Sequence, residues 1–114
     1  MRKWLVILLA VSAIILASGM VYAGEMCSGT KNVTTPGTAV ALESTRIYGR
    51  SIIVKADLAN SGNIYIGDED VLASAFTGVA LDAGEVWIMD AQYMNQIYID
   101  ATVGTEGVSF TYRK

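Results

Sequence analysis

The chain has 114 residues, no histidine, one cysteine and a formal net charge of −3. The absence of histidine removes the commonest general base and metal ligand near neutral pH, and one cysteine cannot form an internal disulfide. The composition therefore excludes zinc sites and cysteine–histidine catalysis, and the length allows one small domain.

Residues 1–23 have the three parts of a secretory signal peptide. Arg2 and Lys3 precede an apolar run over residues 4–16, and small residues then lead to Ala23. The basic residues stay on the cytoplasmic side while the apolar run enters the membrane. We expect an N-terminal hydrophobic signal helix cleaved after Ala23, which leaves a secreted or cell-surface (periplasmic or extracellular) chain of about 91 residues.

Two other fates of this N-terminus are open. Residues 4–22 make a largely apolar stretch of about 19 residues, just long enough to span a bilayer. The alternative to cleavage is therefore a membrane anchor, and the membrane would be a partner only through this segment. Cys27 raises the option of a lipoprotein, but Glu25 lies where a lipobox has small or aliphatic residues.

The exported part is acidic and begins with a polar segment. Loss of Arg2 and Lys3 lowers the net charge to −5, because all 11 acids lie further along the chain. An acidic domain without a basic patch is a poor nucleic-acid binder, so we expect no nucleic-acid partner. Residues 24–37 are small and polar, which predicts a linker or arm.

Short alternating runs fill residues 38–114. Over residues 51–57, Ile52, Val54 and Ala56 alternate with Ile53, Lys55 and Asp57, as in a half-buried strand. Other strands are expected at residues 38–42, 63–66, 79–81, 85–89, 96–102 and 108–112. Turn residues recur about every eight to twelve positions, so we predict an all-β domain, a small antiparallel β-sandwich or barrel of about six to seven strands.

Three of these strands place an aromatic residue between two aliphatic residues: Tyr65, Trp87 and Tyr98. If the aliphatic neighbours face the core, each ring faces the opposite side. The three rings would then form an outer row that binds another subunit or a sugar ring. The equally weighted alternative is that the rings are covered by a loop or the N-terminal arm, or lie inside the sandwich.

Asp68, Glu69 and Asp70 are weak candidates for a calcium site. Calcium requires six to eight oxygen ligands, and the spacing does not match an EF-hand loop. Three adjacent acids at the end of a strand cannot all point the same way. The pattern favours a solvated turn, and we expect no metal and no other cofactor.

Four segments resemble a group of small domains found among tailed-bacteriophage and prophage proteins: residues 50–57, 60–68, 79–85 and 96–102. In such domains a strand enters an N-x-Y-[IV]-G-[DN] hairpin, and an L-x-x-G-E turn and an [IV]-Y-[IV] strand follow. The resemblance implies a β-sandwich and a role in virion structure, and it brings no catalytic residues. The export signal departs from this pattern, because tailed-phage structural proteins assemble in the cytoplasm.

The function expected from these patterns is non-enzymatic. No phosphate-binding loop, nucleophile elbow or dinucleotide fingerprint is present, and a paired-carboxylate hydrolase would need a deep cleft. We expect an exported structural or decoration module that self-associates or docks on a surface or virion-like assembly through a protein partner. The alternative is a secreted ligand-binding module, with a glycan as the possible ligand.

Overall fold

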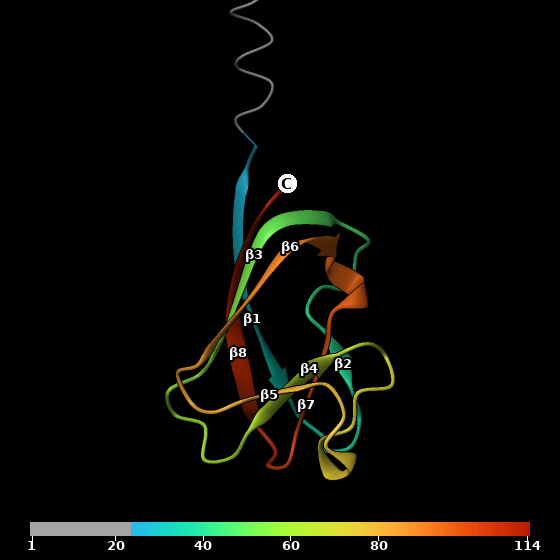
Figure 1. Cartoon of the computed structure of the whole chain (residues 1–114), viewed down its shortest axis with the longest axis vertical. Helices are drawn as coiled ribbons and strands as arrows, with labels where there is room; N and C mark the ends of the chain where they lie inside the picture. Colours follow the sequence, from blue (N-terminus) through green and yellow to red (C-terminus); the bar gives the residue numbers. More distant parts are fainter. Residues whose placement is uncertain (1–23) are drawn as a thin grey trace, which may run out of the picture.

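Two four-stranded antiparallel sheets pack face to face in the computed structural model, which describes residues 24–114 (Figure 1). Sheet A has the order β1 (Met26–Val33), β8 (Glu106–Arg113), β3 (Tyr48–Ala56) and β6 (Val86–Tyr93). Sheet B has the order β2 (Val40–Ala41), β7 (Tyr98–Ala101), β4 (Ile64–Gly67) and β5 (Val79–Leu81). Two short 3-10 turns, η1 (Ala73–Ala75) and η2 (Met94–Gln96), lie between strands.

The predicted all-β sandwich is confirmed, and the described residues form eight strands where six or seven were expected. The predicted signal helix over residues 1–23 lies outside the described residues. From residue 24 onward, the protein contains no helix with the length and apolarity needed to cross a membrane.

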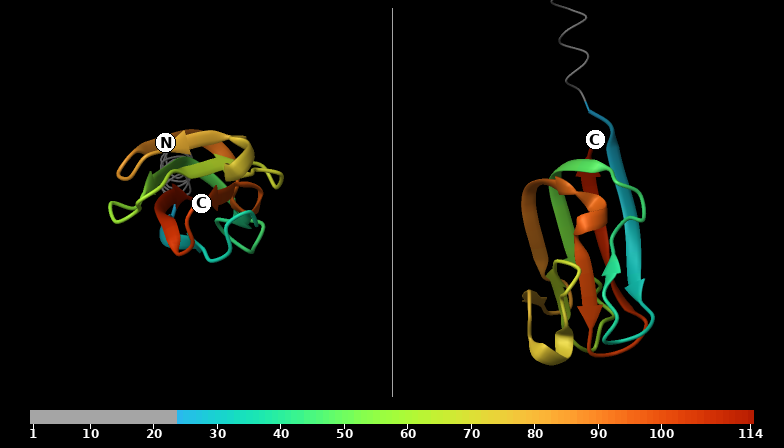
Figure 2. Two further views of the ribbon diagram at one scale, coloured as in Figure 1. Left: turned by 90° about the horizontal axis from the view of Figure 1, so that it is seen from below. Right: turned by 90° about the vertical axis from the view of Figure 1, so that its right-hand side faces the viewer.

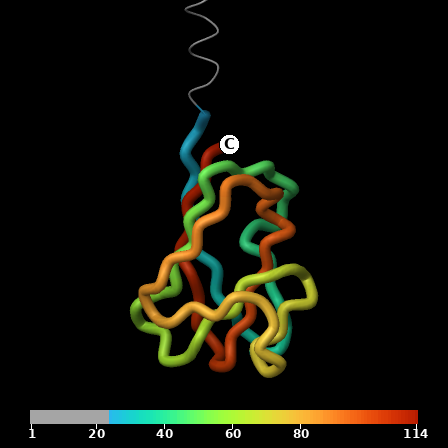
Figure 3. The backbone as a smooth tube through the Cα atoms, in the orientation of Figure 1, coloured from blue at the N-terminus to red at the C-terminus, as the bar shows by residue number. Residues whose placement is uncertain are grey.

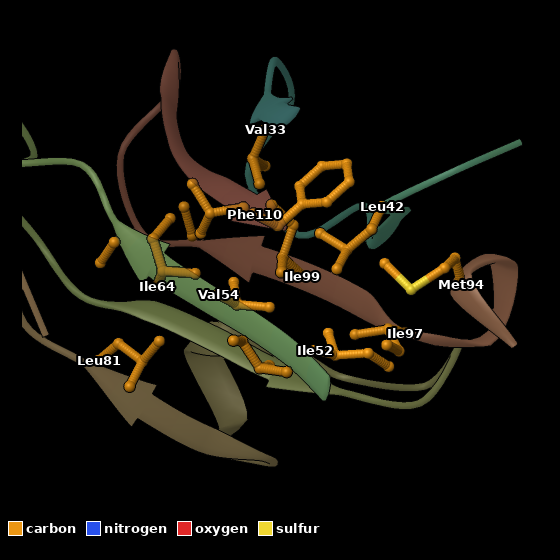
Figure 4. Close-up of a cluster of buried hydrophobic side chains, with 14 of the residues drawn as sticks. Val33, Leu42, Ile52, Val54, Ile64, Leu81, Met94, Ile97, Ile99 and Phe110 are labelled. Atoms are coloured by element: carbon orange, nitrogen blue, oxygen red, sulfur yellow. The ribbon is translucent and has the colours of Figure 1, made fainter. Parts of the chain in front are cut away.

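The core lies between the two sheets and is built from alternate residues of their strands. Ile52, Val54 and Ala56 of β3 are fully buried as predicted, while Ile53 on the same strand is 42% exposed. Sheet B contributes Ile64 and other aliphatic residues to the same cluster (Figure 4). Full burial of such side chains stabilises a fold by about 1.5–3 kcal/mol each.

The polar segment at residues 24–37 contains a strand, so the expectation of a linker or arm is wrong for residues 26–33. Residues 26–33 pair with β8 along the whole strand, from Met26 opposite Arg113 to Val33 opposite Glu106 (Figure 2). Ser28, Thr30 and Asn32 of β1 are exposed, and the alternate positions hold Cys27, Gly29, Lys31 and the buried Val33. Because Phe110 fills the space beside Gly29 and a lysine occupies another of these positions, the sequence of β1 lacks a clear strand signal.

Both ends of the described chain lie at one end of the sandwich (Figure 3). There the Lys114 backbone N–H donates to the Glu25 carbonyl at 2.9 Å, and the Arg50 guanidinium donates to the Lys114 carbonyl at 3.0 Å. These bonds extend the β1–β8 ladder to the last residue. Gly24 therefore lies beside Lys114.

A substitution at Gly29 tests whether β1 belongs to the folded sheet. A Cβ atom at Gly29 would lie 2.8 Å from the Phe110 Cζ atom, so the ring would have to move. Gly29→Ala should lower the free energy of unfolding by about 1–3 kcal/mol, measured by urea denaturation. The exposed neighbour Ser28 provides the control, because Ser28→Ala should stay within about 0.5 kcal/mol of the parent. Equal stability of both variants would mean that β1 is not packed on Phe110.

Candidate functional site

The predicted outer row of three aromatic rings does not form. Tyr65 faces away from the main core as expected, but it is only 6% exposed. The segment around η1 covers it: Val71 and Ala73 pack against the ring, and the Phe76 ring lies edge-on at 6.3 Å. Tyr98 is half-buried and packs against the same small cluster. Tyr65 is therefore a buried residue of the outer side of sheet B.

On β6 the second of the two open orientations is found, with the aromatic ring on the inner side. Trp87 is half-buried and packs against the main core, whereas Val86 and Ile88 are 50% and 69% exposed. All three residues are apolar, so the sequence pattern does not distinguish the two faces of this strand. Trp87 thus faces the core side of β6, where it also lines a small cleft with Ile66. The aliphatic side chains are left on the outer face of sheet A.

The acidic triplet forms an exposed turn. A carboxylate oxygen of Asp68 accepts the Asp70 backbone N–H at 3.0 Å, and the Asp68 carbonyl accepts the Val71 N–H at 3.1 Å. Asp68, Glu69 and Asp70 are all exposed. Across residues 24–114 no group of three or more acidic, cysteine or histidine side chains is arranged to hold a metal ion.

Asp100 is a buried carboxylate that the strand pattern did not single out. Its side chain is fully buried, and its two oxygens accept backbone N–H groups from Gly37 at 3.0 Å and from Ala73 at 2.8 Å. The carboxylate thus ties the connection between β1 and β2, and the η1 turn, to strand β7. A signal was present in the sequence, because Asp100 lies within the otherwise apolar run Ile97–Ala101.

Glu106 makes a second buried clamp at the start of β8. One of its carboxylate oxygens accepts the Ser61 backbone N–H, the Ser61 hydroxyl at 2.8 Å and the Gly62 N–H at 2.9 Å. Desolvation raises the pKa of this carboxyl, but the bonds from the Ser61 hydroxyl, Gly62 and the Ser61 N–H outweigh it and hold the pKa below its ordinary value of 4.5. Glu106 therefore fixes the turn between β3 and β4 in its charged form.

Two adjoining clefts lie where the acidic turn meets the connection between β6 and β7. The larger, of about 450 Å³, is lined by Tyr98 and by six polar side chains: Asp68, Glu69, Asp70, Gln92, Asn95 and Gln96. The smaller, of about 190 Å³, includes Trp87 and shares Asp68, Gln92 and Gln96 with the first. Trp87 and Tyr98 thus line neighbouring hollows, while Tyr65 lines neither.

The outer face of sheet A is a second surface of interest. Cross-strand pairing puts Ser28, Thr111, Ile53 and Ile88 in one row across all four strands. The next row contains Thr30, Ser109, Lys55 and Val86. A shallow depression of about 460 Å³ lies over the middle of these rows. Small hydroxyl side chains on one half of the face adjoin three exposed aliphatic residues on the other half.

No known protein family, curated protein or solved structure matches the chain. The resemblance to phage and prophage domains accordingly stays an expectation from the sequence.

The Glu106 clamp predicts a dependence of stability on pH. A folded-state pKa below the unfolded value stabilises the protein above pH 4.5, and this contribution is lost as the pH falls through the folded-state pKa. Glu106→Gln should lower the free energy of unfolding by about 1–2 kcal/mol at pH 7 and by less near pH 3. Urea denaturation between these pH values measures the difference. Glu69→Gln, at an exposed acid, is the control; an equal effect of the two variants would contradict the clamp.

Proposed function

We propose that this protein is an exported, non-catalytic structural or decoration module that self-associates or docks on a larger surface or virion-like assembly. The observation that carries the proposal is the outer face of sheet A, which exposes Ile53, Val86 and Ile88 side by side. Exposed aliphatic residues are common singly, but a contiguous group on a flat sheet is typical of contact surfaces.

The composition of this face favours a protein partner. Ile53 lies opposite Ile88 on the neighbouring strand, and Lys55 lies opposite Val86. Ser109 and Thr111 on β8 continue the two rows with short side chains, so a second flat surface can approach closely. An apolar patch bordered by polar side chains is a usual arrangement in protein interfaces.

The described acids support a non-catalytic role. Asp100 and Glu106 are buried and accept hydrogen bonds mainly from backbone N–H groups, which suits carboxylates that hold loops in place. The acids of the turn at residues 68–70 are exposed. General acid–base catalysis requires a carboxyl that a substrate can reach, and the buried positions of Asp100 and Glu106 do not suit that role.

Replacing an aliphatic residue on the outer face of sheet A should weaken assembly. Ile88→Lys places a charge on the β6 side of this face, and we expect the dissociation constant of self-association to rise at least about tenfold. Light scattering after size-exclusion chromatography, over a range of concentrations of the exported protein, measures this constant.

Val79 is the matched control for this variant, because it is 48% exposed and lies on an edge strand of sheet B. Val79→Lys should leave self-association unchanged. Loss of assembly in both variants would point to a general effect of charge, and no loss in either would remove the outer face of sheet A from the proposal.

Glycan binding is a second candidate function, favoured by the paired clefts near Tyr98 and Trp87. An aromatic ring surrounded by amide and carboxylate groups can stack on a sugar ring and hydrogen-bond its hydroxyls, as polar groups in ligand pockets do. Gln92 and Gln96 line both clefts and would contact a ligand that bridges them.

If this second function operates, Tyr98→Ala should abolish glycan binding on an array, because it removes the ring from the larger cleft. Tyr48→Ala is the control, since Tyr48 is exposed on β3 and does not line the clefts. A protein that binds no glycan on the array, or a Tyr98→Ala variant that binds as well as the parent, would rule out this candidate.

A further inference from the structure

We propose that two copies of this chain pair through their β6 strands, antiparallel about a twofold axis near Ile88, and join two A sheets into one continuous sheet. The inference rests on the proposed function and deepens it, because it names the partner as a second copy and the contact as a strand edge.

The backbone of β6 has an unpaired edge. The strand ends the order of sheet A, so within the described part of the chain it pairs only with β3. The Ala56 N–H donates to the Glu85 carbonyl at 2.9 Å. Hydrogen bonding alternates along an antiparallel pair, so Trp87 bonds to β3 while Val86 and Ile88 direct their N–H and C=O groups to the open edge. Such a row of groups is a template for another strand.

Among the edge strands of the described chain, β6 is the one best suited to pairing. β2 and β5 have two and three residues, whereas β1 and β6 have eight each. β1 carries Lys31, and lysine is a residue that natural edge strands use to prevent pairing. β6 contains no proline or lysine, and Asp90 is its one charged residue. Its exposed β-branched side chains favour an added strand.

The edge of β6 is complementary to itself. A twofold axis at Ile88 places this residue opposite the Ile88 of a second copy and brings their edge-directed N–H and C=O groups together. Because Ile53 neighbours Ile88 on sheet A, four isoleucines would then form one row across the joined sheet. Asp90 lies opposite Val86 of the second copy, so this register avoids the like-charge pair that an axis at Asp90 would create.

Disulfide trapping tests this geometry on the full-length exported protein. Ile88→Cys, in a Cys27→Ala background, should give a disulfide-linked dimer, because paired residues at the axis have Cα atoms about 5.5 Å apart. Ile53→Cys in the same background should stay monomeric on a non-reducing gel, since its Cα atoms would be about 14 Å apart across three strand spacings. Trapping of Ile53→Cys but not of Ile88→Cys would overturn strand pairing and leave a face-to-face assembly within the proposed function.

A pair of substitutions separates the backbone contact from the side-chain contact. Ile88→Pro removes an N–H group that points to the open edge, while Ile88→Ala removes side-chain atoms alone. Native mass spectrometry should show a dissociation constant at least about tenfold higher for Ile88→Pro than for Ile88→Ala, with circular dichroism confirming that both fold. Equal constants would overturn the inference and leave self-association standing. A parent protein that stays monomeric at all concentrations would overturn both the inference and self-association.

Discussion

The packing of one face of sheet A against one face of sheet B is the interaction on which the rest of this structure depends. The single cysteine is free, so no disulfide reinforces the described fold. Its stability comes from a shared apolar cluster to which β3 gives Ile52 and Val54 and β4 gives Ile64. Each strand must therefore turn every second residue inward. This alternation determines which side chains point outward, where they can contact loops, solvent or a partner.

Two buried carboxylates hold loops in place, a role that disulfides have in many small exported domains. Asp100 holds the connections that lead into β2 and η1, and Glu106 holds the turn before β4. Each accepts backbone N–H groups, so the loops keep their bonding partners in a dry environment. A charged acceptor makes these bonds stronger than neutral ones. The connection between β1 and β2, the η1 turn and the turn between β3 and β4 are thereby tied to strands β7 and β8.

Strand alternation could be predicted from the sequence where neighbouring residues differ in polarity. On β3 the apolar Val54 is next to Lys55, and the predicted alternation of a half-buried strand is present in the structure. On β6 every residue from Val86 to Met89 is apolar, so the sequence left both orientations of Trp87 open. β1 was missed because Gly29 offers no apolar side chain and the ring that covers it, Phe110, belongs to another strand. The burial of Tyr65 depends on the segment at residues 71–76, whose fold over sheet B has no local sequence signal.

The same constraint leads to the proposed assembly. Once Trp87 turns inward to fill the space between the sheets, Val86 and Ile88 must face solvent, next to an edge whose backbone groups have no strand partner among the described residues. Amide hydrogen exchange of Ile88, measured on dilute and concentrated protein, tests this account most directly. We predict that exchange of this N–H slows markedly at high concentration while amides on the β1 edge are unaffected. Equally fast exchange of the Ile88 amide at both concentrations would contradict it.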